Sequence, residues 1–351
     1  MPRAAPSSGP ATLHVSLVAI PEAVVSTLVG IFDVLSAFGM MQGMDMSPPS
    51  ASPFKVEIVG QKPGQLALAS GMPVTVQRGV KDVKATDIII VPSVLLRPEG
   101  WVKGRYPDLV AWVVAMHRRG ALLCSACSGL FLLAETGLFD GMDSTVHFHY
   151  RRRFADTYPQ VPIHPERVLV ISGKREELIS SGASMTWHDL VLYLIGRHAG
   201  ATAAQAVARF FALQWHQEGL APYIVFEGRN DHGDHAIQAA QDWVAKYFSV
   251  ANTLEEMIRH TGLTERTFKR RFTAATGLSP IAYVQRLRIE DAKRRLERTE
   301  VSIDEVSWQV GYEEPAFFRR LFKRVTDLTP GAYRKRFRIP EYARTTKKKT
   351  R

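Results

Sequence analysis

The sequence lacks the features of a secreted, disulfide-stabilised or membrane-spanning protein. Only two of its 351 residues are cysteines, Cys124 and Cys127, which is too few for a disulfide framework. Residues 1–10 are rich in proline and serine and lack the apolar segment of a secretion signal. The longest apolar stretch, residues 23–35, is too short to span a bilayer and contains Asp33. We therefore expect a cytoplasmic protein with reduced thiols and no membrane partner.

A surplus of basic residues is confined to the last third of the chain. Residues 241–351 contain 25 Lys and Arg against 14 Asp and Glu, whereas residues 1–240 contain 20 of each. The net charge of +11 therefore belongs to the C-terminal region. A basic region attached to a neutral one is the electrostatic pattern of a protein that binds a nucleic-acid backbone. The length and the 46% hydrophobic content are sufficient for two domains with separate cores.

The basic region contains an internal repeat. Residues 262–288 and 311–338 align at a fixed offset, apart from one inserted residue. The aligned pairs are Phe268 with Phe318, Phe272 with Phe322, Pro280 with Pro330, Tyr283 with Tyr333, Arg286 with Arg336, and Arg288 with Arg338. The same structural unit is therefore predicted twice.

Each copy follows a short amphipathic helix with recognisable ends. Capping boxes that begin at Thr253 and Ser302 are predicted to open these helices, and Gly262 and Gly311 supply the positive φ that ends them. A second helix, rich in Arg and Lys, follows each glycine. Two helices joined by a tight turn, with a basic second helix, form the helix-turn-helix plan for reading the major groove. Two helical hairpins with a merely solvated basic face are the alternative, which the uneven charge disfavours.

Residues 243–338 resemble the DNA-binding domain of AraC/XylS-type transcription regulators. The resemblance includes Gly-Tyr-Glu-Glu at the second turn and the closing L-T-P-x-x-Y-R. It implies seven helices with two helix-turn-helix units, joined by a long helix over residues 280 to about 298. Because a rigid helix links both units on one chain, we expect them to enter adjacent major-groove turns, about ten base pairs apart, on one face of the DNA.

By this resemblance, outward residues near the start of each second helix face base edges, where a bidentate Arg–guanine contact contributes about 1–3 kcal/mol of discrimination. Arg271 and Lys323 are expected to hold phosphates. Because Pro315 and Phe317 leave the second unit with fewer polar side chains, we expect the first unit to be more sequence-selective. The predicted DNA-binding residues are Thr264, Arg266, Thr267, Lys269, Arg270 and Arg271 in the first unit, and Ala316, Arg319, Arg320 and Lys323 in the second.

The N-terminal region alternates strand-like and helix-like segments. Strands are predicted at residues 13–20, 54–59, 87–91 and 121–124, and helices at residues 23–38, 106–119 and 128–136. The continuous apolar run Asp-Ile-Ile-Ile-Val at 87–91 is typical of a strand that is buried on both faces. This alternation predicts an α/β domain with a doubly wound, mostly parallel, flavodoxin-like sheet and helices on both faces.

A cysteine lies at the sharpest of the predicted strand-to-helix turns. Cys127 has small residues two positions before it, Ser125, and two after it, Gly129. Such an elbow exposes its central side chain at the carboxyl edge of the sheet. The adjacent helix N-terminus is expected to lower the pKa of the thiol. Cys124 points into the sheet and is interpreted as part of the core.

The N-terminal half resembles the PfpI-like, class I glutamine-amidotransferase-like superfamily. The resemblance rests on the elbow at 127–129, the segment LAETGLFDG at 133–141, and Ser-Thr-Val-His at 144–147. Residues 178–189 resemble a later strand and the helix after it, with Asp189 in the usual acidic place. With the C-terminal match, the chain resembles GlxA-type regulators over nearly its full length.

The superfamily includes enzymes in which the elbow cysteine works with a histidine and an acidic residue. Cys127 and His147 match two of these places, but Glu22 falls a few residues early. The loop at residues 92–94 also lacks the glycines of an oxyanion hole. A PfpI-like cysteine hydrolase or glyoxalase-type enzyme fused to a DNA-binding module is the alternative. We prefer a non-catalytic sensor of a small molecule, with no cofactor.

The predicted effector pocket lies at the elbow, outside the carboxyl ends of the strands. Its residues are Cys127, Ser128, His147, Ser93 and Glu22. The helix amides suit an anionic group such as a carboxylate. A purely structural role stays open for Cys127 and for His147. The resemblance suggests an amino acid or a quaternary amine as effector, and activation rather than repression, although no residue decides either.

Two polar clusters could be taken for metal sites. The first is the pair His147 and His149, for which the spacing provides no third ligand, and the second is the glycine-containing segment DHGDH at 231–235. We interpret both as solvated loop and predict no metal site.

The predicted domains are a sensor at residues 11–215, a flexible or semi-flexible linker at 216–235, a DNA-binding domain at 236–338 and a basic tail at 339–351. The expected partners are double-stranded promoter or operator DNA, a small-molecule effector, RNA polymerase and a second copy of the chain in a homodimer.

Overall fold

The computed structural model describes residues 12–41 and 52–340. The chain divides into two compact units, Met1–Leu220 and Ala221–Arg351, and each is described by itself. The basic tail predicted at 339–351 lies almost entirely outside the described residues. No helix in the described part of the chain is both long and apolar enough to cross a membrane.

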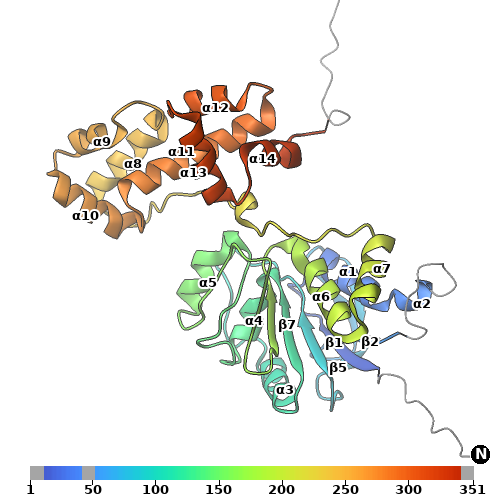
Figure 1. The fold of residues 1–351 in the computed structure, drawn as a ribbon. Coiled ribbons are helices and arrows are strands. Elements are labelled where there is room, and N and C mark those ends of the chain that lie inside the picture. Colours follow the sequence, from blue (N-terminus) through green and yellow to red (C-terminus); the bar gives the residue numbers. More distant parts are fainter. Residues whose placement is uncertain (1–11, 42–51, 341–351) are drawn as a thin grey trace, which may run out of the picture. The chain divides into compact units, whose positions relative to one another are not determined.

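The N-terminal unit is built on a seven-stranded sheet (Figure 1). The strands are β1 (Leu13–Val18), β2 (Phe54–Gly60), β5 (Arg78–Gly79), β6 (Ile88–Val91), β7 (Leu122–Ala126), β8 (Leu169–Ser172) and β9 (Leu178–Ser181). Their order is β5-β2-β1-β6-β7-β9-β8, and only β8 is antiparallel to its neighbour. All four residues of β6 are buried, as its continuous apolar run predicted. The mostly parallel sheet is confirmed.

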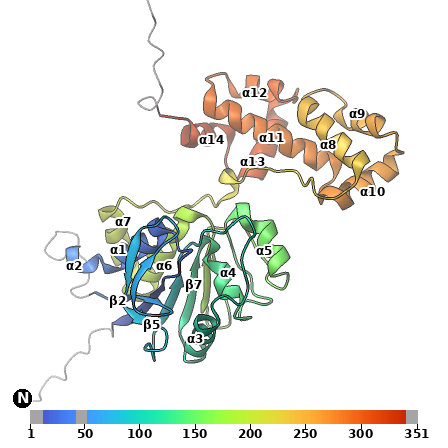
Figure 2. The same cartoon turned by 180° about the vertical axis from the view of Figure 1, so that it is seen from behind.

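Helices cover both faces of this sheet (Figure 2). One face carries α1 (Val25–Ser36), α6 (Trp187–Ala199) and α7 (Ala201–Phe210), and the other carries α3 (Pro107–Arg118) and α4 (Leu130–Ala134). The short α2 (Phe38–Met41) and α5 (Arg151–Thr157) also belong to this unit. Because a Cβ atom at Gly30 would lie 2.6 Å from the Trp187 ring, glycine permits the close approach of α1 and α6.

The sequence pattern did not predict the hairpin of β3 (Gly64–Ala67) and β4 (Pro73–Val76). It also missed the two-residue β5 and the antiparallel β8. Five of the eight residues of β3 and β4 are exposed, so neither strand carries the apolar run that identified β6. Short strands of this kind give too few residues for periodicity to distinguish them from loop.

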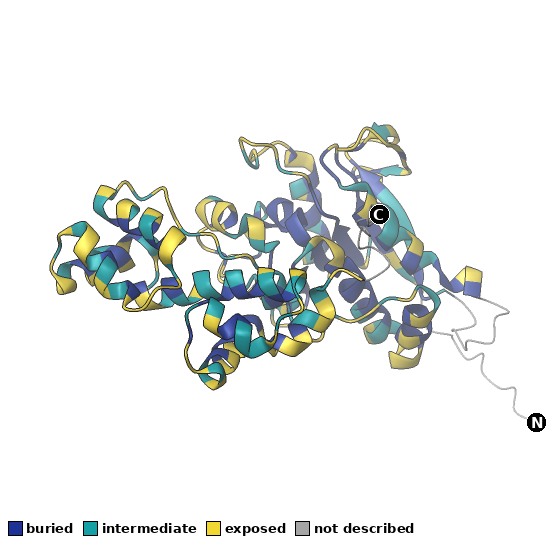
Figure 3. Ribbon diagram, turned by 90° about the horizontal axis from the view of Figure 1, so that it is seen from above, coloured by how far each residue is buried: buried dark blue, intermediate teal, exposed yellow. Residues whose placement is uncertain are grey.

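The C-terminal unit contains seven α-helices in its described part, as the resemblance implied. They are α8 (His235–Tyr247), α9 (Thr253–Thr261), α10 (Glu265–Thr276), α11 (Pro280–Arg298), α12 (Ile303–Gln309), α13 (Pro315–Thr326) and α14 (Pro330–Phe337). The long helix α11 has the bounds expected for the connecting helix. The helices turn their buried faces inward and their exposed faces to solvent (Figure 3).

The two copies of the repeat have the same core contacts. In the first, the rings of Phe272 and Tyr283 are 5.2 Å apart at 87°. In the second, the equivalent rings of Phe322 and Tyr333 are 5.4 Å apart at 81°. Each pair belongs to its own hydrophobic cluster. The repeated sequence therefore forms two small cores of one design.

Of the two predicted N-cap residues, Ser302 is confirmed and Thr253 is wrong. The Ser302 hydroxyl accepts a hydrogen bond from the Glu305 amide at 3.0 Å, and α12 begins after it as predicted. In α9 the N-cap is instead Asn252, with a left-handed φ of 52°, so Thr253 is already the first helical residue. Its hydroxyl donates to the Val250 carbonyl at 2.6 Å. Because the left-handed Asn252 precedes the helix, α9 begins one residue earlier than the capping pattern predicts.

Residues of the segment predicted as a flexible or semi-flexible linker make contacts within the unit to which each belongs. Leu220 is buried in the N-terminal unit. In the C-terminal unit, Tyr223 packs edge-on against Phe337 at 5.0 Å, and Phe226 against Tyr283 at 5.1 Å. Aromatic residues of this segment therefore pack their rings within the C-terminal unit, and the flexible or semi-flexible linker at 216–235 stays a prediction.

Candidate functional site

Helix α10 carries a basic face opposite its buried aromatic face. Phe268 and Phe272 are fully buried, so residues at the intervening positions point outward. Arg266 and Arg270, four residues apart, are both exposed on this outward face. In the described part of the chain neither guanidinium has a hydrogen bond or an ion pair. Two arginines near the start of the second helix of a helix-turn-helix unit are thus free for an external acceptor.

The remaining predicted contacts on the first unit are partly engaged. Lys269 forms an ion pair with Glu265, and the hydroxyls of Thr264 and Thr267 are 3.0 Å apart. All but Thr267, which is half-buried, are exposed. They remain on the same surface as the two free arginines.

Arg271, which is predicted to hold a phosphate, has an acidic partner in its own unit. Its Nε and an Nη donate to the two carboxylate oxygens of Asp234 at 2.9 and 2.7 Å. Asp234 also accepts the Ile237 amide at 3.2 Å and so caps α8. The Arg271 hydrogen bond holds the pKa of Asp234 below its ordinary value. This pair joins α10 to α8 through Asp234, while Asp231, Gly233 and His235 of the same segment are exposed.

The second unit presents fewer free cations than the first. Ala316, Arg319, Arg320 and Lys323 are all exposed on α13. Arg319 forms an ion pair with Asp304 of α12, and an Arg320 Nη lies 4.0 Å from a Glu314 carboxylate oxygen. Acidic residues of the same unit therefore partly neutralise the arginines of α13.

The elbow in the N-terminal unit has the expected backbone. Cys127 has a positive φ of 55°, a strained conformation for a residue with a side chain. It begins a 3-10 turn, Cys127–Gly129, that leads directly from β7 into α4. A Cβ atom at Gly129 would lie 2.4 Å from the Val91 carbonyl oxygen. Glycine two positions after the cysteine is therefore required by the close approach of the β6 carboxyl end.

The environment of the Cys127 thiol contradicts the predicted low pKa. Burial raises this pKa, and the hydroxyls of Ser184, Ser93 and Ser128 oppose the shift only in part. The thiol is 2% exposed, and its sulfur lies 3.6 Å from the Ser184 oxygen. No cation adjoins it among the described residues. A thiol that stays protonated is a poor nucleophile.

The other predicted pocket residues do not form a triad with the thiol. The Glu22 carboxylate accepts hydrogen bonds from Arg105 and Tyr106. His147 uses its Nδ1 to accept the His149 amide at 3.1 Å. Among the described residues, neither has a hydrogen bond to Cys127. The pocket that is predicted to contain all three stays a prediction, because their hydrogen bonds do not test it.

Ser93 and Ser128 are the predicted residues that do meet at the elbow. The Ser128 hydroxyl donates to the Val94 carbonyl at 2.6 Å and accepts the Val94 amide at 2.9 Å. The Ser93 hydroxyl accepts from Thr27 at 3.0 Å. Sequence reasoning missed Ser184, which follows β9 and reaches the thiol only because β7 and β9 are neighbours. These contacts make a polar, closely packed elbow.

Comparison with known proteins assigns both units to families. Residues 31–192 match the DJ-1/PfpI family, and residues 257–336 match a helix-turn-helix domain. The transcriptional regulator CdhR of Pseudomonas aeruginosa is 26% identical over 278 residues, covering 76% of this chain and 77% of that protein. GbdR of the same species is 25% identical and covers 72% and 67%. The regulator GlxA of Rhizobium meliloti is 24% identical and covers 58% and 62%.

The order of the two matched families is the order of the two units described above. The DJ-1/PfpI match contains the elbow of the N-terminal unit, and the helix-turn-helix match contains the first copy of the repeat and all but the last two residues of the second. The chain thus combines a DJ-1/PfpI domain with an AraC-type helix-turn-helix domain, and it is similar over most of its length to HTH-type transcriptional regulators such as CdhR and GbdR.

Proposed function

We propose that this chain activates transcription by binding specific duplex sites through its C-terminal unit, under the control of a small metabolite that binds its N-terminal unit. The observation that carries the DNA-binding part is the pair Arg266 and Arg270. Both are exposed, lie on one face of α10 and have no acidic partner among the described residues. Guanidinium groups in that position can make bidentate bonds to guanine in the major groove.

The connection between the two helix-turn-helix units supports binding to one face of the duplex. Helix α11 is 19 residues long, which corresponds to about 28 Å. This length is close to the ~34 Å that separates successive major-groove turns. The first unit supplies most of the base reading, because Arg266 and Arg270 are free. The second mainly contributes phosphate contacts and orientation.

The N-terminal unit acts as a sensor without turnover. A buried, protonated thiol that lacks a histidine partner does not support nucleophilic catalysis. The strained elbow, with Ser93, Ser128 and Ser184 around the thiol, is retained as a binding feature. The effector is a small metabolite, of which amino acids and quaternary amines are the first to test. A homodimer and contact with RNA polymerase complete the proposal.

The DNA-binding part is tested by selecting a preferred site for the full-length chain from random duplexes. We expect the selected site to bind more tightly than random DNA at moderate salt. The double change Arg266→Ala and Arg270→Ala is expected to remove most of this preference. Lys246→Ala, which removes a positive charge from the exposed face of α8, should retain it. No preference by the unmodified chain would contradict the proposal.

The sensing part is tested by screening small nitrogenous metabolites for an increase in the melting temperature of the full-length chain. A ligand that binds only the folded state raises this temperature. Ser184→Ala and Cys127→Ala should reduce the increase without weakening DNA binding. A ligand that stabilises all variants equally would place the effector site away from the elbow. Thiol-dependent turnover lost in Cys127→Ala would favour an enzyme.

A further inference from the structure

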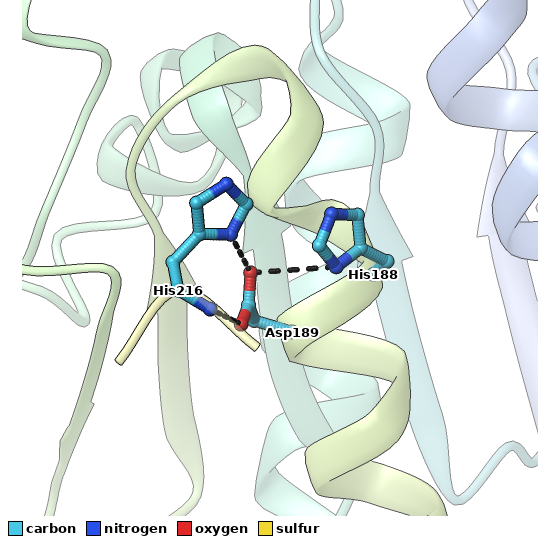
Figure 4. Close-up of side chains that lie close together, drawn as sticks. All are labelled: His188, Asp189 and His216. Atoms are coloured by element: carbon cyan, nitrogen blue, oxygen red, sulfur yellow. Dashed lines mark hydrogen bonds and ion pairs between the residues drawn. The ribbon is translucent and has the colours of Figure 1, made fainter. Parts of the chain in front are cut away.

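Two histidines and one carboxylate meet on the α6 and α7 side of the N-terminal unit. His188 and Asp189 lie in the first turn of α6, and His216 lies in the irregular segment after α7. Figure 4 shows the Nδ1 atoms of both histidines directed at one oxygen of the Asp189 carboxylate. The distances to this oxygen are 3.5 Å from His188 and 2.7 Å from His216. The three ligand atoms lie within 4.8 Å of one another.

One of these ligand atoms lacks a hydrogen bond. The Nδ1 of His188 is buried and has no hydrogen-bond partner in the described part of the chain, and the residue is only 8% exposed. Leaving a buried polar atom without a partner costs about 1–3 kcal/mol. Asp189, in contrast, is well supported, since its other oxygen accepts the His216 backbone amide at 3.0 Å. Hydrogen bonds therefore fix the Asp189 carboxylate, whereas the Nδ1 of His188 has no hydrogen bond in the described part of the chain.

A hollow adjoins the cluster and leaves one side of it accessible. It has a volume of about 880 Å³. The lining residues include Asp189, Leu192, Tyr193, Arg197, Trp215 and His216. Because Asp189 and His216 belong to this lining, a group bound between them can take a further ligand from the hollow.

We propose that His188, Asp189 and His216 bind a divalent transition-metal ion through their Nδ1, carboxylate and Nδ1 atoms. Two imidazoles and one carboxylate are a donor set of zinc and related first-row metals, whereas calcium and magnesium prefer oxygen alone. Water or a small molecule in the hollow supplies the fourth ligand.

The geometry requires only small adjustments to accept the ion. Ligand atoms about 2.0–2.2 Å from a tetrahedral ion are about 3.3–3.6 Å from each other. The His188 distance already falls in this range, and the His216 nitrogen has to retreat by roughly half an ångström. The two rings are nearly parallel, 18° apart, so each has to turn about its terminal torsion, which is broad for histidine. Neutral His216 then carries its proton on Nε2.

The test uses the full-length chain after removal of metals with a chelator. Titration with Zn²⁺ should give one bound ion per chain, and Co²⁺ in its place should develop the visible absorption of a four-coordinate site. His188→Gln is the most informative variant, because the Nδ1 that it removes makes no hydrogen bond. Loss of the stoichiometric ion in His188→Gln and in Asp189→Asn is the expected result.

His164→Gln is the matched control. Its two ring nitrogens face different carboxylates, Asp143 at 3.0 Å and Glu166 at 3.7 Å, so its neighbours do not converge on one ion. This variant should bind Zn²⁺ as the unmodified chain does. The proposal is overturned if the chain takes up no Zn²⁺, if Mg²⁺ binds equally well, or if His188→Gln retains the ion. Each of these outcomes leaves DNA binding by α10 and α13 unaffected, so it is distinct from failure of the proposed function.

Discussion

The two helix-turn-helix units share a core but differ on their surfaces. The paired rings of Phe272 and Tyr283 recur almost unchanged at Phe322 and Tyr333. At the outward positions, Arg266 is matched by Ala316, and the arginines of the second unit face acidic residues of their own unit. Packing restricts the buried positions, because close-packed cores tolerate little change in volume. The exposed positions are free to diverge, so one fold can serve base reading in one copy and anchoring in the other.

The largest effect is expected from breaking the shared core. Phe272→Ala and Phe322→Ala each remove a fully buried ring and should destabilise the C-terminal unit by about 3–5 kcal/mol. Because the two environments are equivalent, the losses should be similar. Urea unfolding of the full-length chain, monitored by circular dichroism, measures the loss of stability in each variant. Phe317→Ala, which changes a half-buried ring, is the milder control. Losses that differ several-fold would show that the cores are not equivalent.

A second difference between the units is the pair Arg271 and Asp234. The aligned position in the second unit is the buried Leu321, so only the first unit depends on this charge pair. Asp234→Asn should therefore lower the melting temperature of the C-terminal unit at neutral pH. Asp231→Asn, which changes an exposed carboxylate three residues earlier, should have little effect. If Asp234→Asn and the unmodified chain had the same melting temperature at pH 7, the charge pair would not stabilise the C-terminal unit.

The Asp234 contribution should depend on pH in one direction. Its pKa is lower in the folded chain than the ordinary value of 3.8. The stabilisation is therefore fully present above that ordinary value and is lost as the pH falls through the folded pKa. The difference in melting temperature between the unmodified chain and Asp234→Asn should accordingly shrink below about pH 4. A difference that persists or grows in acid would exclude the charge pair as its cause.

The smallest effect is expected from releasing the arginines of the second unit. Asp304→Asn and Glu314→Gln together remove the acidic partners of Arg319 and Arg320. The chain should then bind random DNA slightly more tightly, and the logarithmic salt dependence should steepen by about one unit per added phosphate contact. Glu255→Gln, an exposed acid on α9, is the control. An unchanged salt dependence would mean that the acids do not restrain α13.

Much of the fold could be predicted from local signals. The apolar run of β6, the glycines after α9 and α12, and Pro280 at the start of α11 each indicate one conformation to the exclusion of others. Strand β5, with two residues, offers no such signal. The start of α9 was misplaced because a left-handed Asn252 precedes it, and neither the capping pattern nor composition predicts that conformation.

The candidate sites were harder to predict because they depend on tertiary contacts. The outward position of Arg266 and Arg270 follows from helical periodicity alone. The role of Arg271 depends on Asp234, 37 residues away in the sequence, and the pKa of Cys127 depends on the burial of the whole elbow. His188 and His216 are brought together by the chain folding back after α7. No local pattern connects such pairs.

The most direct measurement compares Arg270→Ala with Arg320→Ala in the full-length chain, using the selected duplex and a random duplex at the same salt concentration. Arg270→Ala should weaken binding to the selected site by about 10- to 100-fold, as expected for a lost arginine–guanine contact, and should change random binding far less. Arg320→Ala should weaken both modestly and equally. An equal loss of specificity in the two variants, or a larger loss in Arg320→Ala, would contradict the division of base reading and anchoring between the two units.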